Sequence, residues 1–119
     1  MDKIKEKRGT PRIEEKLPIR LADGDYSAVV ETKNISASGV YFTADKPMPL
    51  MSKVVITLLL PCNHGKNSKV ECHGTVVRTA PMEIQGKAMY ETAIFFDDIT
   101  EKAKNMISRY VKRTIEGNA

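Results

Sequence analysis

The chain has 119 residues, with 19 Lys and Arg against 15 Asp and Glu, a formal net charge of +4 and 41% hydrophobic residues. This length and composition are typical of one globular domain with its own core. The modest basic excess permits an anionic ligand. Aromatic residues make up only 6% of the chain, and none stands among the basic residues of positions 1–12, where a general nucleic-acid groove would need them.

The N-terminus is charged and has no apolar segment behind it, so it does not resemble a secretory signal. The longest apolar run, residues 54–60, is much shorter than the roughly 18 residues needed to cross a membrane. We therefore expect a cytoplasmic protein without membrane insertion.

Residues 1–15 show no apolar periodicity, and Gly9 and Pro11 interrupt any helix. This pattern predicts a flexible basic arm, followed by one domain over residues 16–119. Within the arm, Arg8 and Arg12 stand four residues apart. A solvated tail is the commoner explanation of such a pair taken alone.

Alternating apolar residues and turn signals predict six β-strands, at about residues 17–21, 26–33, 40–44, 53–60, 69–79 and 88–96. Val77 breaks the alternation in the fifth strand, which indicates a bulge near Gly74. Residues 80–87 are expected to form a loop. Six strands joined by short turns predict an antiparallel barrel or sandwich.

The last segment changes period, because its apolar residues recur at steps of three, four and seven. This predicts a helix over residues 98–116, begun by a capping box of Asp98 and Glu101 and ended at Gly117. We expect the helix to pack on the barrel or close one of its ends. A dimerising helix is the alternative.

Residues 32–40 form a polar stretch between two predicted strands. The side chains of Asn34, Ser36 and Ser38 can bond to nearby backbone, and Gly39 is expected to provide a position with positive φ. The stretch predicts a rigid turn that presents polar groups, although a purely structural turn is the commoner explanation.

Four potential zinc ligands, Cys62, His64, Cys72 and His73, lie within twelve residues. They form no C-x-x-C unit, and the adjacent Cys72 and His73 would face opposite sides of a strand. We therefore expect reduced cysteines and no metal.

The sequence also gives no sign of an enzyme. It has no phosphate-binding loop or dinucleotide fingerprint, and the neighbouring Asp97 and Asp98 suit the start of the helix better than acid–base catalysis.

The arm and the turn together resemble a known family. Arg8-x-x-x-Arg12, followed by a strand, a hairpin, a second strand and then Asn34-x-Ser36-x-x-Gly39, resembles the two-part signature of the PilZ domain. The resemblance covers residues 7–116, and it implies a six-stranded antiparallel, split-barrel-like β-barrel with a C-terminal α-helix. Ala93 stands where the family often has glycine.

PilZ domains are bacterial receptors for cyclic di-GMP, so the resemblance implies that this second messenger is the ligand. It further implies that an unidentified protein receives the signal when the arm becomes ordered, in a process such as motility or biofilm formation. The chain would be a monomer or homodimer with no role in DNA binding. The implied ligand-binding residues are Lys7, Arg8, Arg12, Asn34, Ser36 and Gly39.

Two other functions are compatible with the sequence. The chain could be a PilZ-fold interaction adaptor that does not bind the nucleotide, or a small barrel that binds single-stranded nucleic acid. A barrel that binds single-stranded nucleic acid would show steeply salt-dependent binding to oligonucleotides and no competition by cyclic di-GMP.

Overall fold

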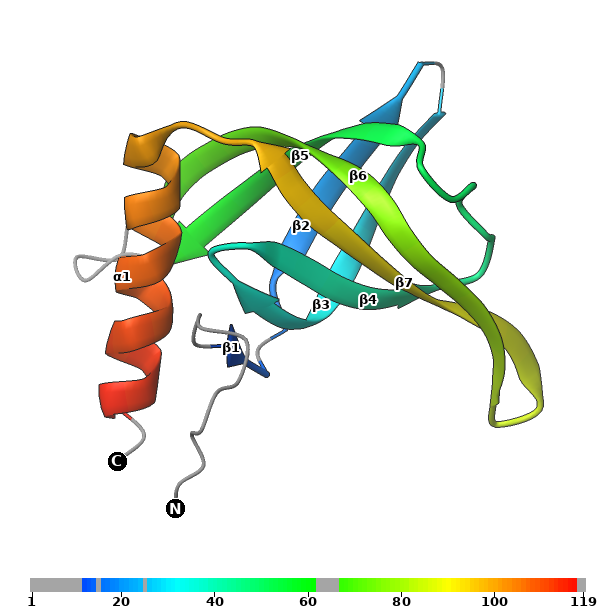
Figure 1. The fold of residues 1–119 in the computed structure, drawn as a ribbon. Coiled ribbons are helices and arrows are strands. Elements are labelled where there is room, and N and C mark those ends of the chain that lie inside the picture. Colours follow the sequence, from blue (N-terminus) through cyan, green and yellow to red (C-terminus); the bar gives the residue numbers. More distant parts are fainter. Residues whose placement is uncertain (1–11, 15, 25, 62–66, 118–119) are drawn as a thin grey trace.

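The computed structural model describes residues 12–14, 16–24, 26–61 and 67–117, which form a closed antiparallel β-barrel with one helix beside it (Figure 1). Neighbouring strands follow the order β3-β2-β5-β6-β7-β4, and pairing between β3 and β4 closes the barrel, while β1 adds to β3. The predicted six-stranded barrel with a C-terminal helix is therefore confirmed. The elements are β1 (Arg12–Ile13), β2 (Pro18–Asp23), β3 (Tyr26–Ser36), β4 (Gly39–Ala44), β5 (Lys53–Pro61), β6 (Asn67–Ile84), β7 (Lys87–Asp98) and α1 (Glu101–Gly117).

The alternation of apolar residues places one face of each strand inside the barrel. In β5, Val54, Ile56 and Leu58 are almost fully buried, whereas Lys53 and Leu59 are exposed. Burying a side chain of this size stabilises the fold by roughly 1.5–3 kcal/mol. Other fully buried side chains continue this core around the barrel: Phe42, Ile19, Leu21, Ile35, Ile94 and Val76.

The β6–β7 pair contains two register shifts. The register shifts between His73 and Gly74, near the predicted bulge, but the extra residue there is Asp97 of β7 and not a residue of β6. A second shift leaves Val77 as an extra residue of β6. Such bulges bend a strand and increase its twist, which helps a sheet to close into a barrel.

The loop predicted at residues 80–87 is wrong. β6 and β7 remain paired to Ile84 and Lys87, and only Gln85 and Gly86 form the turn, with φ of 51° and 79°. Positive φ at both central residues is typical of a type I′ hairpin turn. Pro81 is tolerated because β6 pairs with β5 only up to Thr75, so beyond that point β6 has β7 alone beside it.

Helix α1 uses its apolar stripe within the chain, with Ile107 and Val111 buried in the core together with strand residues. Thr100 begins the helix, because its Oγ1 accepts a hydrogen bond from the Ala103 backbone N–H at 3.1 Å. The predicted capping box is therefore wrong: Asp98 is the last residue of β7. Within the described part of the chain, α1 is neither long nor apolar enough to span a membrane.

This assignment predicts that Thr100→Ala lowers the free energy of unfolding by about 1 kcal/mol, because the helix loses its N-cap acceptor. Thr100→Ser should retain most of the stability, and Asp98→Ala should change it little. Denaturant unfolding of the three variants tests this, and a larger loss in Asp98→Ala than in Thr100→Ala would contradict it.

Candidate ligand-binding site

The polar turn is shorter than predicted, because β3 continues through Asn34 to Ser36 and β4 begins at Gly39. The fully buried Ser36 Oγ accepts a hydrogen bond from the Ser38 backbone N–H at 3.2 Å and lies 3.0 Å from the Ser38 Oγ. Asn34, which lies two residues before Ser36 on the same face of β3, is half-buried. The turn is therefore rigidly held by its own serines.

Gly39 is needed for a different reason from the one predicted. Its φ is not positive; instead, a Cβ at this position would lie 2.4 Å from the backbone oxygen of Ile94. The Ser38 carbonyl oxygen accepts a hydrogen bond from the Phe96 backbone N–H at 2.9 Å. The motif turn therefore lies directly against β7, and only glycine fits there.

Strand β1 brings the end of the predicted arm to this turn. Arg12 is paired with Ser36 and Ile13 with Ile35, while Ser36 is also paired with Gly39 on its other side. The backbone of Ser36 thus lies between those of Arg12 and Gly39, in three neighbouring strands. The other predicted arm residues, Lys7 and Arg8, lie outside the described residues.

The strand register defines a wider outer surface around the turn. Directly opposite residues of antiparallel strands share a face. Ile35 belongs to the core, so strand alternation places Ser36 on the outer face, although Ser36 is itself buried. Two parallel rows of outer-face residues therefore cross β3, β4 and β7, and we call them the outer grid. The rows are Asn34, Tyr41 and Ala93, and next to them Ser36, Gly39 and Phe95.

Polar contacts hold one corner of the outer grid. Burial and a hydrogen bond to Glu91 raise the pKa of Tyr41. The same hydrogen bond lowers the pKa of Glu91, and a hydrogen bond from Arg78 lowers it further. The Arg78 Nη2 lies 3.5 Å from the Glu91 Oε1. Sequence reasoning did not include Tyr41 or Phe95 in the site, because their positions depend on pairing between distant strands.

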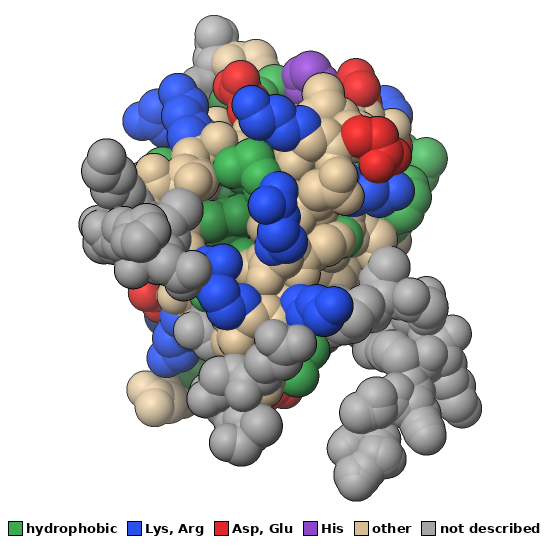
Figure 2. All heavy atoms as spheres, turned by 90° about the vertical axis from the view of Figure 1, so that its left-hand side faces the viewer, with side chains coloured by type: hydrophobic (Ala, Val, Ile, Leu, Met, Phe, Trp, Pro, Cys, Tyr) green, Lys and Arg blue, Asp and Glu red, His purple; other side chains and the backbone are tan. Residues whose placement is uncertain are grey.

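A basic surface lies on the side of the molecule where α1 runs. Lys and Arg side chains outnumber acidic ones on the face that Figure 2 shows. Arg109 and Arg113 line a groove of about 260 Å³ between α1 and the ends of β5 and β6, where the Arg113 Nη2 donates to the Pro61 carbonyl oxygen at 3.0 Å. Because α1 also packs near β1, this positive potential would attract an anionic ligand toward the turn.

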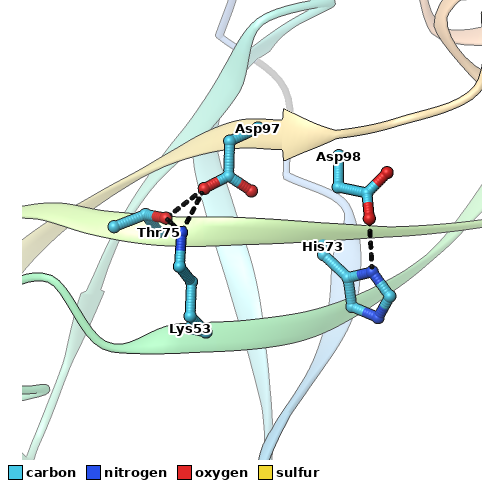
Figure 3. A network of polar contacts seen from close by, with 5 residues as sticks. All are labelled: Lys53, His73, Thr75, Asp97 and Asp98. Atoms are coloured by element: carbon cyan, nitrogen blue, oxygen red, sulfur yellow. Dashed lines mark hydrogen bonds and ion pairs between the residues drawn. The ribbon is translucent and has the colours of Figure 1, made fainter.

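A second polar cluster lies at the C-terminal end of β7 (Figure 3). The Lys53 Nζ lies 2.8 Å from both the Thr75 Oγ1 and the Asp97 Oδ2, and Thr75 also donates to Asp97. The hydrogen bonds from Lys53 and then Thr75 lower the pKa of Asp97. Asp97 is thus a carboxylate used in a cross-strand contact, not a residue that begins the helix as predicted.

The potential metal ligands are not brought together in the described part of the chain. Cys72 is 4% exposed and faces the core, whereas the adjacent His73 is exposed, with its Nδ1 3.4 Å from the Asp98 Oδ2. The opposite orientation predicted for this pair is confirmed. Among residues 12–14, 16–24, 26–61 and 67–117, no group of three or more His, Cys, Asp or Glu could hold a metal ion; Cys62 and His64 lie outside this part.

Comparison with known protein families agrees with the motif and the barrel. A family model described as PilZ domain matches residues 6–113. The chain belongs to the PilZ domain family. This is a family of cyclic di-GMP receptors, and PilZ domains are generally non-catalytic.

Several solved PilZ structures share the fold at low sequence identity. Bacillus subtilis MotI, an inhibitor of motility, is 16% identical, with a TM-score of 0.82 over 95% of this chain and 53% of that chain. The cyclic di-GMP complex of K. pneumonia MrkH is 14% identical, with a TM-score of 0.72 over 93% of this chain and 53% of that one. The PilZ domain of Escherichia coli YcgR with cyclic di-GMP is 8% identical, with a TM-score of 0.68 over 94% of this chain and 96% of that one.

The chain thus spans about half the length of the MotI and MrkH chains. No curated protein matches this PilZ chain in sequence. The likeness to the solved structures supports the fold alone.

The close contact at Gly39 predicts that Gly39→Ala lowers the free energy of unfolding by about 2 kcal/mol, because the added methyl group must displace the β7 backbone. Gly24→Ala is the matched control: its φ is +63°, but no atom lies within 4 Å of the added carbon. It should therefore cost only about 1 kcal/mol through backbone strain. Thermal or denaturant unfolding tests this, and an equal or smaller loss for Gly39→Ala would contradict it.

The buried Cys72 predicts an inert thiol. Burial raises its pKa from 9.0 to about 12, so its contribution to stability is complete below pH 9 and is lost as the pH rises from 9 toward 12. In a Cys62→Ser variant, a thiol reagent at pH 8 should not react with the folded protein but should titrate one thiol in denaturant. Rapid reaction in the folded state would show that Cys72 is accessible.

Proposed function

We propose that this PilZ chain is a receptor for cyclic di-GMP, which it binds through Arg8 and Arg12 of the arm and through Asn34, Ser36 and Gly39 of the turn. Lys7, just before the first arginine, would contribute to the charge around the phosphates. The observation that carries the proposal is the pairing of Arg12 with Ser36. It joins the two halves of the motif, which are far apart in the sequence.

The chemistry of the ligand suits these residue types. Cyclic di-GMP carries two phosphodiester groups and two guanines, and a guanidinium can bind bidentately to a phosphate or to the O6 and N7 edge of guanine. The Asn34 amide can donate and accept hydrogen bonds with a second guanine edge. Gly39 allows the ligand to approach the backbone closely, since it has no side chain.

The output would be a protein contact that depends on the ligand. Ordering of the arm around the nucleotide has a conformational cost, which is subtracted from the binding energy. In return, the ordered arm and the bound ligand create a surface that the ligand-free protein lacks, and an effector protein can recognise it. The related proteins differ in their reported roles, inhibition of motility for MotI and transcription regulation for MrkH, so the effector of this chain is not indicated by them.

Calorimetric titration with cyclic di-GMP should reveal saturable binding that is weakened about ten- to hundredfold by Arg12→Ala or Arg8→Ala, because each removes a charged hydrogen bond worth roughly 1.5–3 kcal/mol. Arg20→Ala is the matched control, since Arg20 is an exposed arginine on β2, and it should leave the affinity unchanged. Plain GMP should bind far more weakly.

Equal affinity of the parent and both arginine variants would exclude the arm from the site. Absence of binding at tens of micromolar cyclic di-GMP would refute the receptor function and favour an adaptor that acts through protein contacts alone.

A further inference from the structure

The outer grid contains two small residues and two aromatic residues arranged in a checkerboard. In the β4–β7 ladder, Gly39 is paired with Phe95 and Tyr41 with Ala93. Because alternate residues of a strand share a face, Tyr41 follows Gly39 on the outer surface of β4, and Phe95 follows Ala93 on β7. The two aromatic side chains therefore stand on one diagonal, and the two small residues, the buried Gly39 and the half-buried Ala93, form the floor between them.

Phe95 differs from the other phenylalanines of the chain. Phe42 and Phe96 are 0% and 4% exposed and belong to the core, whereas Phe95 is 49% exposed. Its cross-strand partner is a glycine that cannot acquire a side chain, since Ile94 blocks the position. About half of the Phe95 side chain thus remains in water, next to a buried glycine.

The spacing of the two aromatic positions matches a planar base. Diagonal cross-strand neighbours lie about 7–8 Å apart. A ring that makes van der Waals contact on both sides at about 3.5–4 Å needs the same separation. Tyr41 is half-buried and hydrogen-bonded to Glu91, which restricts its side chain before any ligand arrives.

The slot also adjoins the residues proposed to bind the nucleotide. Gly39 is paired with Ser36 on one side and Phe95 on the other, and Asn34 is paired with Tyr41. Two strand steps of about 4.8 Å separate β3 from β7, so a base held over the floor lies about 5–10 Å from the Asn34 and Ser36 positions. This span is within one dinucleotide. β3, β4 and β7 are consecutive strands of the barrel wall (Figure 1).

We propose that Phe95 is a base-stacking residue, and that one guanine of cyclic di-GMP lies over Ala93 in the slot between Phe95 and Tyr41. The inference rests on the proposed receptor function and adds to it a specificity-determining aromatic residue outside the two sequence motifs. Every base has a π-face, so Phe95 supplies affinity, and the polar groups of Asn34 and Ser36 supply the preference for guanine.

A structural role for Phe95 makes a different prediction. An aromatic side chain opposite a glycine can cover the glycine backbone and stabilise the strand pair. In that case any large apolar side chain at position 95 serves equally well, and the ligand makes no contact with it. Leucine and tyrosine at this position therefore separate the two roles.

The test is calorimetric titration of cyclic di-GMP into the parent chain and the variants Phe95→Ala, Phe95→Leu and Phe95→Tyr. We expect affinity to fall about 5- to 100-fold in Phe95→Ala and Phe95→Leu, as for loss of one base–aromatic stack, and to change less than about threefold in Phe95→Tyr. Val29→Ala is the control, because Val29 is an apolar β3 residue that is 66% exposed outside the outer grid. It should bind like the parent.

A second measurement reports the contact directly. In the NMR spectrum of the complex, Phe95 ring protons should show intermolecular nuclear Overhauser effects to a guanine, and the ring resonances should shift upfield on binding. Thermal unfolding of each variant without ligand confirms that it is folded.

The outcomes are distinguishable. Parent affinity in Phe95→Leu, or an absence of ring–guanine contacts, would overturn the stacking role while leaving the receptor function in place, provided that Arg12→Ala still loses binding. A parent chain that does not bind cyclic di-GMP would overturn both.

Discussion

The close approach of the β3–β4 turn to β7 is the constraint on which the candidate site depends. The Ser38 carbonyl oxygen accepts a hydrogen bond from the Phe96 N–H, and the Ile94 backbone leaves no room for a side chain at position 39. This contact holds the β3–β4 turn against β7. The motif glycine therefore serves packing first, because its buried backbone lies directly against β7.

The barrel and the core could be predicted from the sequence because they depend on local signals. Alternation of apolar residues placed five of the six strands within a few residues, and the Val77 interruption correctly indicated a bulge. The extension of the β6–β7 pair beyond Thr79 was missed because proline usually interrupts a strand. Pro81 is compatible with β6 because β5 no longer pairs with β6 at that position, which the sequence does not reveal. The helix cap was misplaced for a related reason: Thr100 and Asp98 are both good N-cap residues, and only the end of β7 decides between them.

Part of the candidate site could be located from the sequence. The motif residues of the turn could be named from sequence, because the spacing of Asn34, Ser36 and Gly39 is carried by one continuous segment. Phe95 could not, since its place beside Gly39 is set by the register between β4 and β7. The positive-φ explanation of Gly39 failed because a sequence does not reveal how near another backbone comes. The structure leaves the positions of Lys7 and Arg8 as predictions.

The pairing of β1 with β3 has a thermodynamic consequence for a receptor. Among the described residues, two pairs join these strands, so detachment of β1 is a local event with a smaller free energy than global unfolding. Arg12 leaves the neighbourhood of Ser36 whenever β1 opens, and the apparent dissociation constant is then the intrinsic one divided by the fraction of closed molecules. If the chain is the proposed receptor, substitutions at Ile13, which is 7% exposed against the core, would therefore change the apparent affinity for cyclic di-GMP without contacting it.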